Sequence, residues 1–293
     1  MRGALIGLYL AQIVNSGLAL GAVYGIMALG FSLIFNASRL INFAQGELLL
    51  LGGLCVTSLA GAMHLSPAMA LVAAAAAGFL LGRVLFASTL RLTLAASPLR
   101  QLMLTVAASL VFQGVAILIW GKNPIMPPRL LPLPDLRLGP IFLGRDTLTA
   151  LTLALASVLV LTVFLGHTRL GRALRATAAN PVGARLQGVD TVLCHALSFS
   201  LAGVLASLAA LAVGPQAMLR YDMGLGLGLK GFAAATIGGY VSLGRVFAGG
   251  LILGLAEATL VLTLSGELKE TATYLLLIVL LVAAPREGEA DRP

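Results

Sequence analysis

The sequence predicts an all-α integral membrane protein, a polytopic bundle of about eight to nine transmembrane helices with some broken or re-entrant elements. Of its 293 residues, only 10% are charged and 59% are hydrophobic, and the mean hydropathy is +1.01. Soluble domains carry about 25% charged residues. The apolar residues also form long runs, near the ~20 residues that cross a bilayer core of about 30 Å. A β-barrel would show short alternating segments instead.

The predicted spans follow these apolar runs. They cover residues 8–35, 48–62, 67–90, 101–120, 147–165, 191–213, 246–264 and 273–284. The first run begins with Arg2 and apolar residues, as a secretory signal does. It continues to about Phe35 without a cleavage pattern of small residues, so we expect it to be retained as a span. A Gly-rich run at 224–239 is too short and too broken to be assigned as a full span.

Polar or helix-breaking segments separate the runs. Residues 36–47 form either a loop or a break within the membrane. Gly214 and Pro215 end the sixth run, and the tail from Pro285 is charged. The segment 121–146 contains six prolines, so we expect little regular helix there.

The charges of the loops predict the orientation. Residues 168–190 contain four arginines and one aspartate, so the positive-inside rule places the segment 167–190 in the cytoplasm. Alternation then places 91–100 in the cytoplasm and the Pro-rich loop 121–146 outside, although that loop also contains Lys122 and three arginines. The side on which the N-terminus lies stays open.

The net charge of +8 is spread over loops and is not gathered on one face with interleaved aromatic residues. This distribution disfavours a nucleic-acid partner. Cys55 and Cys194 lie in or beside apolar runs, which favours small buried residues over a disulfide or a metal site. The three histidines are scattered, and no Cys/His cluster has the spacing of metal ligands. We therefore expect no metal and no cofactor.

Glycines recur every four residues in two of the predicted spans. Gly17, Gly21 and Gly25 lie in the first, and Gly250 and Gly254 lie in the span at 246–264. Residues spaced by four share one helix face, and small residues there allow a second helix to approach closely. These five glycines are therefore predicted to serve helix packing.

Three ionisable residues lie in or beside the spans. Glu47 follows Asn42 and Gln45 at the start of a span, where it either faces a cavity or partner or is solvated at the interface. Glu257 lies near the middle of its span, which favours a buried partner. Lys230 lies in the broken Gly-rich run and could pair with either glutamate. That run would then line a path through the membrane. Alternatively, the lysine side chain extends to the membrane interface.

No motif in the sequence predicts catalysis. There is no Gly-rich phosphate loop, no His-Glu-x-x-His pair and no spacing that selects a Ser/His/Asp set. We expect a subunit that is not an enzyme and that draws energy from an ion gradient or from another subunit. The rarity of ionisable residues in the spans speaks against a proton-coupled carrier, which needs a proton relay.

The basic loop has the pattern of two short helices. Residues 172–179 predict the first, which Asn180 and Pro181 stop because proline lacks a backbone donor and restricts the residue before it. Pro181 can begin a second helix that runs to Leu186, and Gly188 ends it. Such a pair of helices makes a rigid projection that can transmit the movement of a partner protein to the membrane spans. The alternative is an ordinary positive loop.

Three stretches of the chain resemble one family. Residues 15–30 (NSGLALGAVYGIMALG) and 40–47 (LINFAQGE) look like the opening of the H-type permease subunit of branched-chain amino acid ABC transporters. Residues 175–188 (RATAANPVGARLQG) resemble the cytoplasmic coupling segment of that family. The run 228–239 (GLKGFAAATIGG), with the later glycines and Glu257, is similar to its C-terminal half. The likeness spans nearly the whole chain, with the stretches in family order.

The resemblance implies a single transmembrane permease domain, 1–293, in the bacterial inner membrane. It implies ATP-driven import of branched-chain or related amino acids. The implied partners are a second, M-type-like permease, two ATP-binding subunits, a periplasmic solute-binding protein and membrane lipid. Coupling to the ATPases would be carried by Asn180, Pro181, Ala184, Arg185 and Gly188.

The resemblance also implies that Asn42, Gln45 and Glu47 form a broken element near the solute pathway, to which the ionisable pattern adds Lys230 and Glu257. The family often has His followed by Gly-Asp where this chain has Gln-Gly-Glu, and the Pro-rich loop has no clear match. The choice among amino acids, short amides and urea therefore stays open.

Two functions from other classes compete with this one. The first is an autonomous secondary carrier or channel for a small polar solute. The second is a membrane-embedded scaffold without transport, which the broken polar elements disfavour.

Overall fold

The computed structural model describes residues 2–93, 96–127, 133–138, 141–213, 217–263 and 268–283. Within this part, seven helices are long and apolar enough to cross a membrane. They are α1 (Arg2–Ser38), α2 (Gln45–Met63), α3 (Pro67–Ser88), α4 (Pro98–Trp120), α5 (Arg145–His167), α8 (Thr191–Val213) and α10 (Leu243–Thr263). A shorter apolar helix, α9 (Met223–Gly238), lies before α10, and α11 (Leu268–Ala283) follows it. The prediction of a polytopic helical membrane protein is confirmed.

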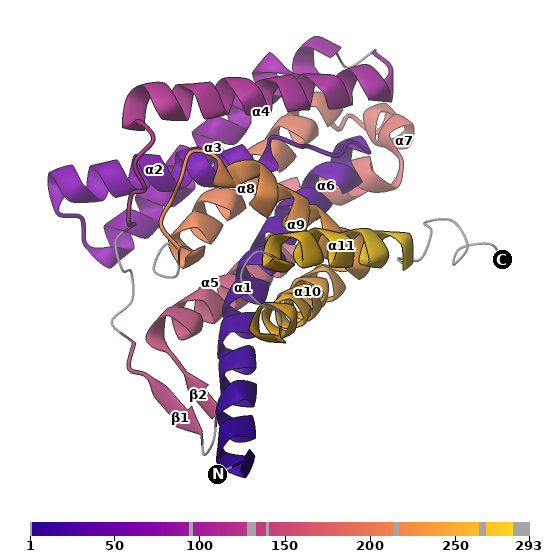
Figure 1. The fold of residues 1–293 in the computed structure, drawn as a ribbon. Coiled ribbons are helices and arrows are strands. Elements are labelled where there is room, and N and C mark those ends of the chain that lie inside the picture. Colours follow the sequence, from indigo (N-terminus) through magenta and orange to yellow (C-terminus); the bar gives the residue numbers. More distant parts are fainter. Residues whose placement is uncertain are drawn as a thin grey trace.

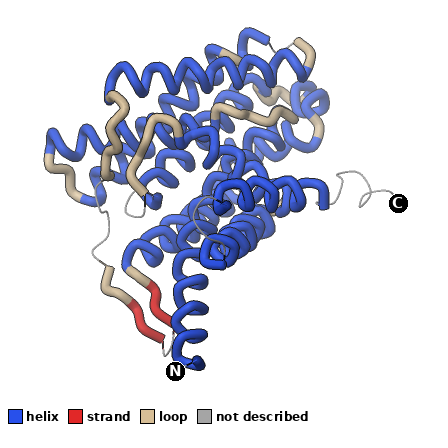
Figure 2. Tube along the Cα trace, viewed as in Figure 1, coloured by secondary structure: helices blue, strands red, loops and turns tan. Residues whose placement is uncertain are grey.

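The connections contain the remaining elements. A 3-10 turn, η1 (Leu90–Thr93), follows α3, and two short helices, α6 (Arg169–Ala179) and α7 (Pro181–Leu186), join α5 to α8. The Pro-rich loop holds an antiparallel hairpin of β1 (Leu136–Leu138) and β2 (Ile141–Leu143), which the all-α prediction did not include. Figure 2 shows helix nearly throughout the described chain and strand in this hairpin.

Several sequence predictions fall outside the described residues. They concern the break at Gly214 and Pro215, the charged tail from Pro285 and part of the Pro-rich loop, residues 128–132 and 139–140.

Helix α1 is the centre of the bundle, and Figure 1 shows it running through the molecule. Residues 22–31 are buried without interruption, so this part of the helix is surrounded on every side. It packs on α10, α8, α9 and α5. A helix that is apolar all round is stable only where protein or lipid encloses it.

The five glycines spaced by four lie at the contact between α1 and α10. A Cβ atom on Gly250 would overlap the backbone of Gly25, and one on Gly254 would overlap the backbone of Gly21. From the other side, a Cβ on Gly17 would lie 2.9 Å from the Cα atom of Leu255. Neither helix can carry larger residues at this seam unless the two backbones separate.

The two ends of α1 mark the two sides of the bundle. In its first half, Asn15 Oδ1 accepts hydrogen bonds from the backbone N–H of Gly144 (2.8 Å) and the hydroxyl of Thr147 (2.9 Å), beside the β-hairpin. Beyond its end, Arg39 Nη2 donates to the carbonyl of Ala178 in α6 (3.4 Å). The start of α1 therefore lies on the same side as the Pro-rich loop, which the sequence alone left open.

Two helices begin inside the bundle. Gln45, the first residue of α2, donates from Nε2 to the carbonyl of Ala202 in the middle of α8 (3.0 Å). The start of α9 meets the start of α2, because a Cβ on Gly46 would overlap the carbonyl of Gly224. Residues 39–44, between α1 and α2, are thus a non-helical break that is mostly buried in the bundle, and α2 begins three residues earlier than predicted. That shift places Gln45 and Glu47 in its first turn.

Replacing Gly254 with alanine tests the α1–α10 seam. The added methyl group must displace the backbone of Gly21, and overpacking of this kind costs about 1–3 kcal/mol. We expect Gly254→Ala to lower the thermal unfolding temperature of the detergent-solubilised protein. The matched control is Gly114→Ala in α4, where no atom lies within 4 Å of the new Cβ. The control should unfold at or above the wild-type temperature, and equal unfolding temperatures for both variants would contradict the seam.

Candidate functional site

A buried ionic cluster joins three helices. Lys230 Nζ of α9 lies 2.6 Å from Glu257 Oε1 of α10. The hydroxyl of Tyr24, on α1, donates to Glu257 Oε2 (2.7 Å) and accepts from Lys230 Nζ (3.2 Å). The side chains of Lys230 and Glu257 are only 18% and 8% exposed. Each charge is therefore compensated inside the bundle, as a buried ion pair requires.

The cluster borders a cavity of about 670 Å³ on the side of the β-hairpin. Its wall combines charged groups, namely Asp135, Arg145, Asp146, Lys230 and Glu257, with apolar ones such as Leu20, Val23, Val213 and Leu227. The cavity thus offers both signs of charge and an aliphatic surface to one small molecule. Ligand sites commonly pair a mostly apolar wall with a few placed polar groups.

A second cavity of about 360 Å³ lies at the other end of α1. Ser32 and Asn36 of α1 line it, together with Arg39 just after α1 and residues of α6 and of the turn between α9 and α10. Between the two cavities, Met27 and Phe31 of α1 are buried and packed. Tyr24 at the first cavity and Ser32 at the second are eight residues apart, which corresponds to about 12 Å along the helix.

Glu47 is buried apart from the ionic cluster. It is 1% exposed, and its Oε1 accepts a hydrogen bond from the hydroxyl of Ser109 in α4 (3.3 Å). Its Oε2 has no hydrogen-bond partner among the described residues. A Cβ on Gly224 would lie 2.5 Å from that oxygen, so the carboxyl group rests against the first turn of α9.

Asn42 and Gln45 hold the break between α1 and α2 in place. Asn42 Oδ1 accepts from the backbone N–H of Ala44 (3.1 Å), and its Nδ2 donates to Gln45 Oε1 (3.4 Å). Both side chains are fully buried. Because buried backbone groups must find partners, these amides stabilise a non-helical turn inside the bundle.

The structure decides between the alternatives that the sequence left open. Lys230 pairs with Glu257 and not with Glu47, and it does not snorkel to an interface. Glu47 is not solvated. The polar residues therefore form two separate groups, one around Glu257 and one around Glu47.

The loop before α9 carries an exposed ion pair. Arg220 donates from Nη2 to Asp222 Oδ2 (2.5 Å), and this hydrogen bond holds the pKa of Asp222 below its ordinary value. Both side chains are exposed, to 58% and 37%, so the pair contributes little to stability.

Helices α6 and α7 form the projection that the basic loop predicts. Asn180 Oδ1 accepts from the backbone N–H groups of Val182 (3.0 Å) and Gly183 (2.9 Å), which caps α7. Pro181 occupies the first turn, and Ala184 is buried. Arg185 Nε donates to the carbonyl of Pro181 (3.2 Å) while its side chain stays exposed. The N-cap and the proline fix the corner between the two helices.

Gly188 closes this projection. Its φ is +81°, a left-handed conformation that glycine adopts without the steric cost other residues pay. Its N–H donates to the carbonyl of Arg185 (3.0 Å), and Val189 N–H donates to Ala184 (3.0 Å). These bonds terminate α7 as glycine commonly terminates helices and direct the chain into α8.

Sequence reasoning missed Tyr24 and Ser109, which complete the two polar groups. Tyr24 carried a usable signal, since tyrosines of spans gather at the membrane interfaces and this one lies deep within a long apolar run. Ser109 carried none, because serine is common in spans and its partner Glu47 lies 62 positions away.

The described residues contain no group of three or more His, Cys, Asp or Glu that could hold a metal ion. Cys55 and Cys194 are both free, and Cys194 is buried.

Comparison with known proteins identifies the family. The family model described as branched-chain amino acid transport system / permease component matches residues 13–284. The permease protein LivH of Salmonella typhimurium is 29% identical over 98% of this chain and 97% of its own length. The permease protein BraD of Pseudomonas aeruginosa is 30% identical over 97% and 96%. Both are named as parts of high-affinity branched-chain amino acid transport systems.

A solved structure shares the fold. PsaBC from Streptococcus pneumoniae in complex with Fab matches with a TM-score of 0.56, covering 99% of this chain and 97% of the matched chain at 15% identity. Since the family model extends over nearly the whole sequence, this chain belongs to the permease components of branched-chain amino acid transport systems.

Proposed function

We propose that this chain is a membrane-spanning subunit of an ATP-driven bacterial importer for branched-chain or related amino acids. It forms part of the solute pathway in the inner membrane and pairs with a second permease. Two separate ATPase subunits supply the energy, and a periplasmic binding protein delivers the solute. The transport role rests on family membership; the partners and the solute are inferred from the features below.

The observation that best supports an external energy source is the projection of α6 and α7. It is capped at Asn180, closed at Gly188 and tied to the end of α1 through Arg39. At its tip, Val182 and Leu186 are 58% and 85% exposed. Apolar side chains on a rigid, otherwise basic projection favour docking to a protein surface. Because a short connection joins α7 to α8, a partner that moves α7 would also move α8.

The two cavities favour a pathway along α1. The cavity at the hairpin side carries two cations, three carboxylates and an aliphatic wall, which suits a zwitterion with an apolar side chain. The cavity at the α6 side adjoins the projection. The packed layer around Met27 and Phe31 separates them, so a solute would pass only when the helices around that layer rearrange. Lys230 and Glu257 would meet the solute on the first side.

Reconstitution tests the proposed function. The chain, produced with a second permease, two ATPases and a binding protein from the same genomic neighbourhood, should take up L-leucine or a related solute into vesicles only when ATP is present. Omitting the ATPases is the control. Uptake by the purified chain alone, without ATP, would show an autonomous carrier or channel instead.

Substituting Gly188 with valine tests the coupling role. A β-branched residue at φ +81° costs about 1–2 kcal/mol in the left-handed region, so the end of α7 must shift. We expect ATP hydrolysis by the complex to persist while solute uptake falls about tenfold. The control is Gly166→Val at the end of α5, where no atom lies within 4 Å of the new Cβ. Wild-type uptake by Gly188→Val would refute the coupling role.

Single and double substitutions of Lys230 and Glu257 distinguish a structural role of the ion pair from a role in the solute pathway. Lys230→Met or Glu257→Gln alone leaves a buried charge unpaired, which costs about 3–5 kcal/mol. The double variant Lys230→Met/Glu257→Met removes both charges, so its thermal stability should recover most of that loss. Uptake should stay low in the double variant if the charges meet the solute. Recovery of both stability and uptake would make the pair purely structural.

A further inference from the structure

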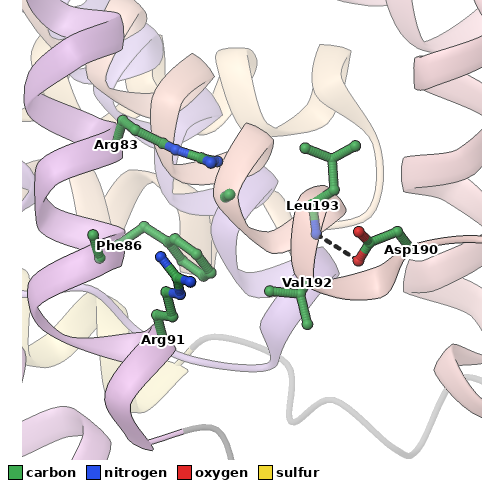
Figure 3. Close-up of a pocket in the computed structure, with 8 residues that line it drawn as sticks. Arg83, Phe86, Arg91, Asp190, Val192 and Leu193 are labelled. Atoms are coloured by element: carbon green, nitrogen blue, oxygen red, sulfur yellow. Dashed lines mark hydrogen bonds between the residues drawn. The ribbon is translucent and has the colours of Figure 1, made fainter.

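A charged cavity outside the proposed pathway lies between the end of α3, η1 and the start of α8. Its volume is about 180 Å³, and Figure 3 shows the side chains around it. Arg83, Arg91 and Asp190 supply the charge. The rest of the lining is apolar: Phe86, Ala87, Val192, Leu193 and Ala196. None of these residues belongs to the ionic cluster or to the group around Glu47.

The two arginines lack partners within the described part of the chain. Neither Arg83 nor Arg91 forms an ion pair with a described acid, and no described acceptor takes a hydrogen bond from either guanidinium. Asp190 already accepts from the backbone N–H of Leu193 through Oδ1 (3.0 Å), which caps α8 (Figure 3). Two cations and one anion thus face one cavity. Guanidinium groups bind phosphate and carboxylate oxygens preferentially, often in a bidentate manner.

The position of the cavity points to the membrane interface. Arg83 lies five residues before the end of α3, about 8 Å inside a span, and α3 is held there against α8, since a Cβ on Gly82 would overlap the carbonyl of Phe199. Arg91 follows in η1. A long basic side chain at this depth extends toward the headgroup layer. Asp190 lies four residues after the end of α7, so this is the side of the projection, which the loop charges assign to the cytoplasm.

An apolar surface adjoins the charged groups. On α3, Leu80 and Val84 are 63% and 54% exposed, and on α8, Val192 and Leu193 are 40% and 47% exposed. In a membrane protein such surfaces face acyl chains. The site therefore presents cations at headgroup depth beside an acyl-facing surface, and this combination fits a lipid better than a free anion.

We propose that this cavity binds the headgroup of an anionic phospholipid of the phosphatidylglycerol type. Arg83 and Arg91 donate to the phosphate oxygens, and Asp190 accepts from a headgroup hydroxyl. The lipid's single negative charge balances the excess of one cation in the cavity. Basic pockets between helices on the cytoplasmic side are known to recognise anionic headgroups.

The bound lipid would also hold the junction after the projection. Asp190 both lines the cavity and caps α8. Three residues, Gln187, Gly188 and Val189, separate it from α7. Occupancy would therefore restrain residues 187–190, through which the projection acts on α8. This consequence rests on the proposed coupling role, whereas the binding site itself does not.

Lipid retention by the full chain in nanodiscs tests the site. Wild-type protein should enrich phosphatidylglycerol over phosphatidylcholine in native mass spectrometry, and the double variant Arg83→Gln/Arg91→Gln should bind it about tenfold more weakly, since charge-assisted hydrogen bonds are lost. Arg100→Gln, an exposed arginine at the start of α4 outside the cavity lining, is the control for net charge. It should retain the lipid as the wild type does.

Three outcomes would overturn the proposal. The first is equal phosphatidylglycerol retention by the double variant and the wild type. The second is equal thermal stabilisation by inorganic phosphate and by the lipid at matched concentration, which would show a phosphate site. The third is loss of ATPase-subunit binding in the double variant with lipid retention unchanged, which would make the arginines a protein contact. Because lipid retention is measured without transport, a failure here is distinct from a failure of the proposed importer function.

Discussion

The close approach of α1 and α10 is the constraint on which the polar groups depend. Five glycines remove the side chains that would otherwise hold the two backbones apart. Only at that separation can the Tyr24 hydroxyl of α1 reach the Glu257 carboxylate of α10 at 2.7 Å. In hydrocarbon, helices gain little from the hydrophobic effect, so packing of small residues and interhelical hydrogen bonds carry their association. The seam and the ionic cluster therefore support each other.

The second constraint is the supply of partners for backbone groups where helices break inside the bundle. The break before α2 uses Asn42 and Gln45 as internal hydrogen-bonding groups. α4 takes part as well, because Thr105 Oγ1 accepts from the backbone N–H of Phe43 (3.3 Å) and Ser109 donates to Glu47. Within the described residues of α4, Thr105, Ser109 and Ala116 are the buried ones. Its attachment near the break is thus polar, while the rest of the helix is available to lipid or a partner.

Much of this arrangement could be predicted from the sequence, because its signals are local. The length of the apolar runs predicted the membrane spans, and the spacing of glycines predicted a packing face. Asn180, Pro181 and Gly188 predicted both short helices of the projection. What could not be predicted depends on distances between helices. The partner of Lys230 was ambiguous, since Glu47 and Glu257 are equally acidic and only the tertiary fold decides which lies near. The start of α2 was missed for a related reason: tertiary contacts to Ala202 and Gly224 let a helix begin on polar residues that hydropathy assigns to a loop.

The contrast between the two buried glutamates follows from where helices end. Glu257 lies in mid-helix, where no free backbone N–H is available, so its charge needs a cation and a hydroxyl, and it has both. Glu47 has no such cation among the described residues, yet it lies in the first turn of α2 and against the first turn of α9. The N-terminus of a helix carries partial positive charge from its unpaired N–H groups, and two of them converge on this carboxyl group. The starts of two helices thus favour negative charge at Glu47, whereas Lys230 and Tyr24 compensate the charge of Glu257 directly.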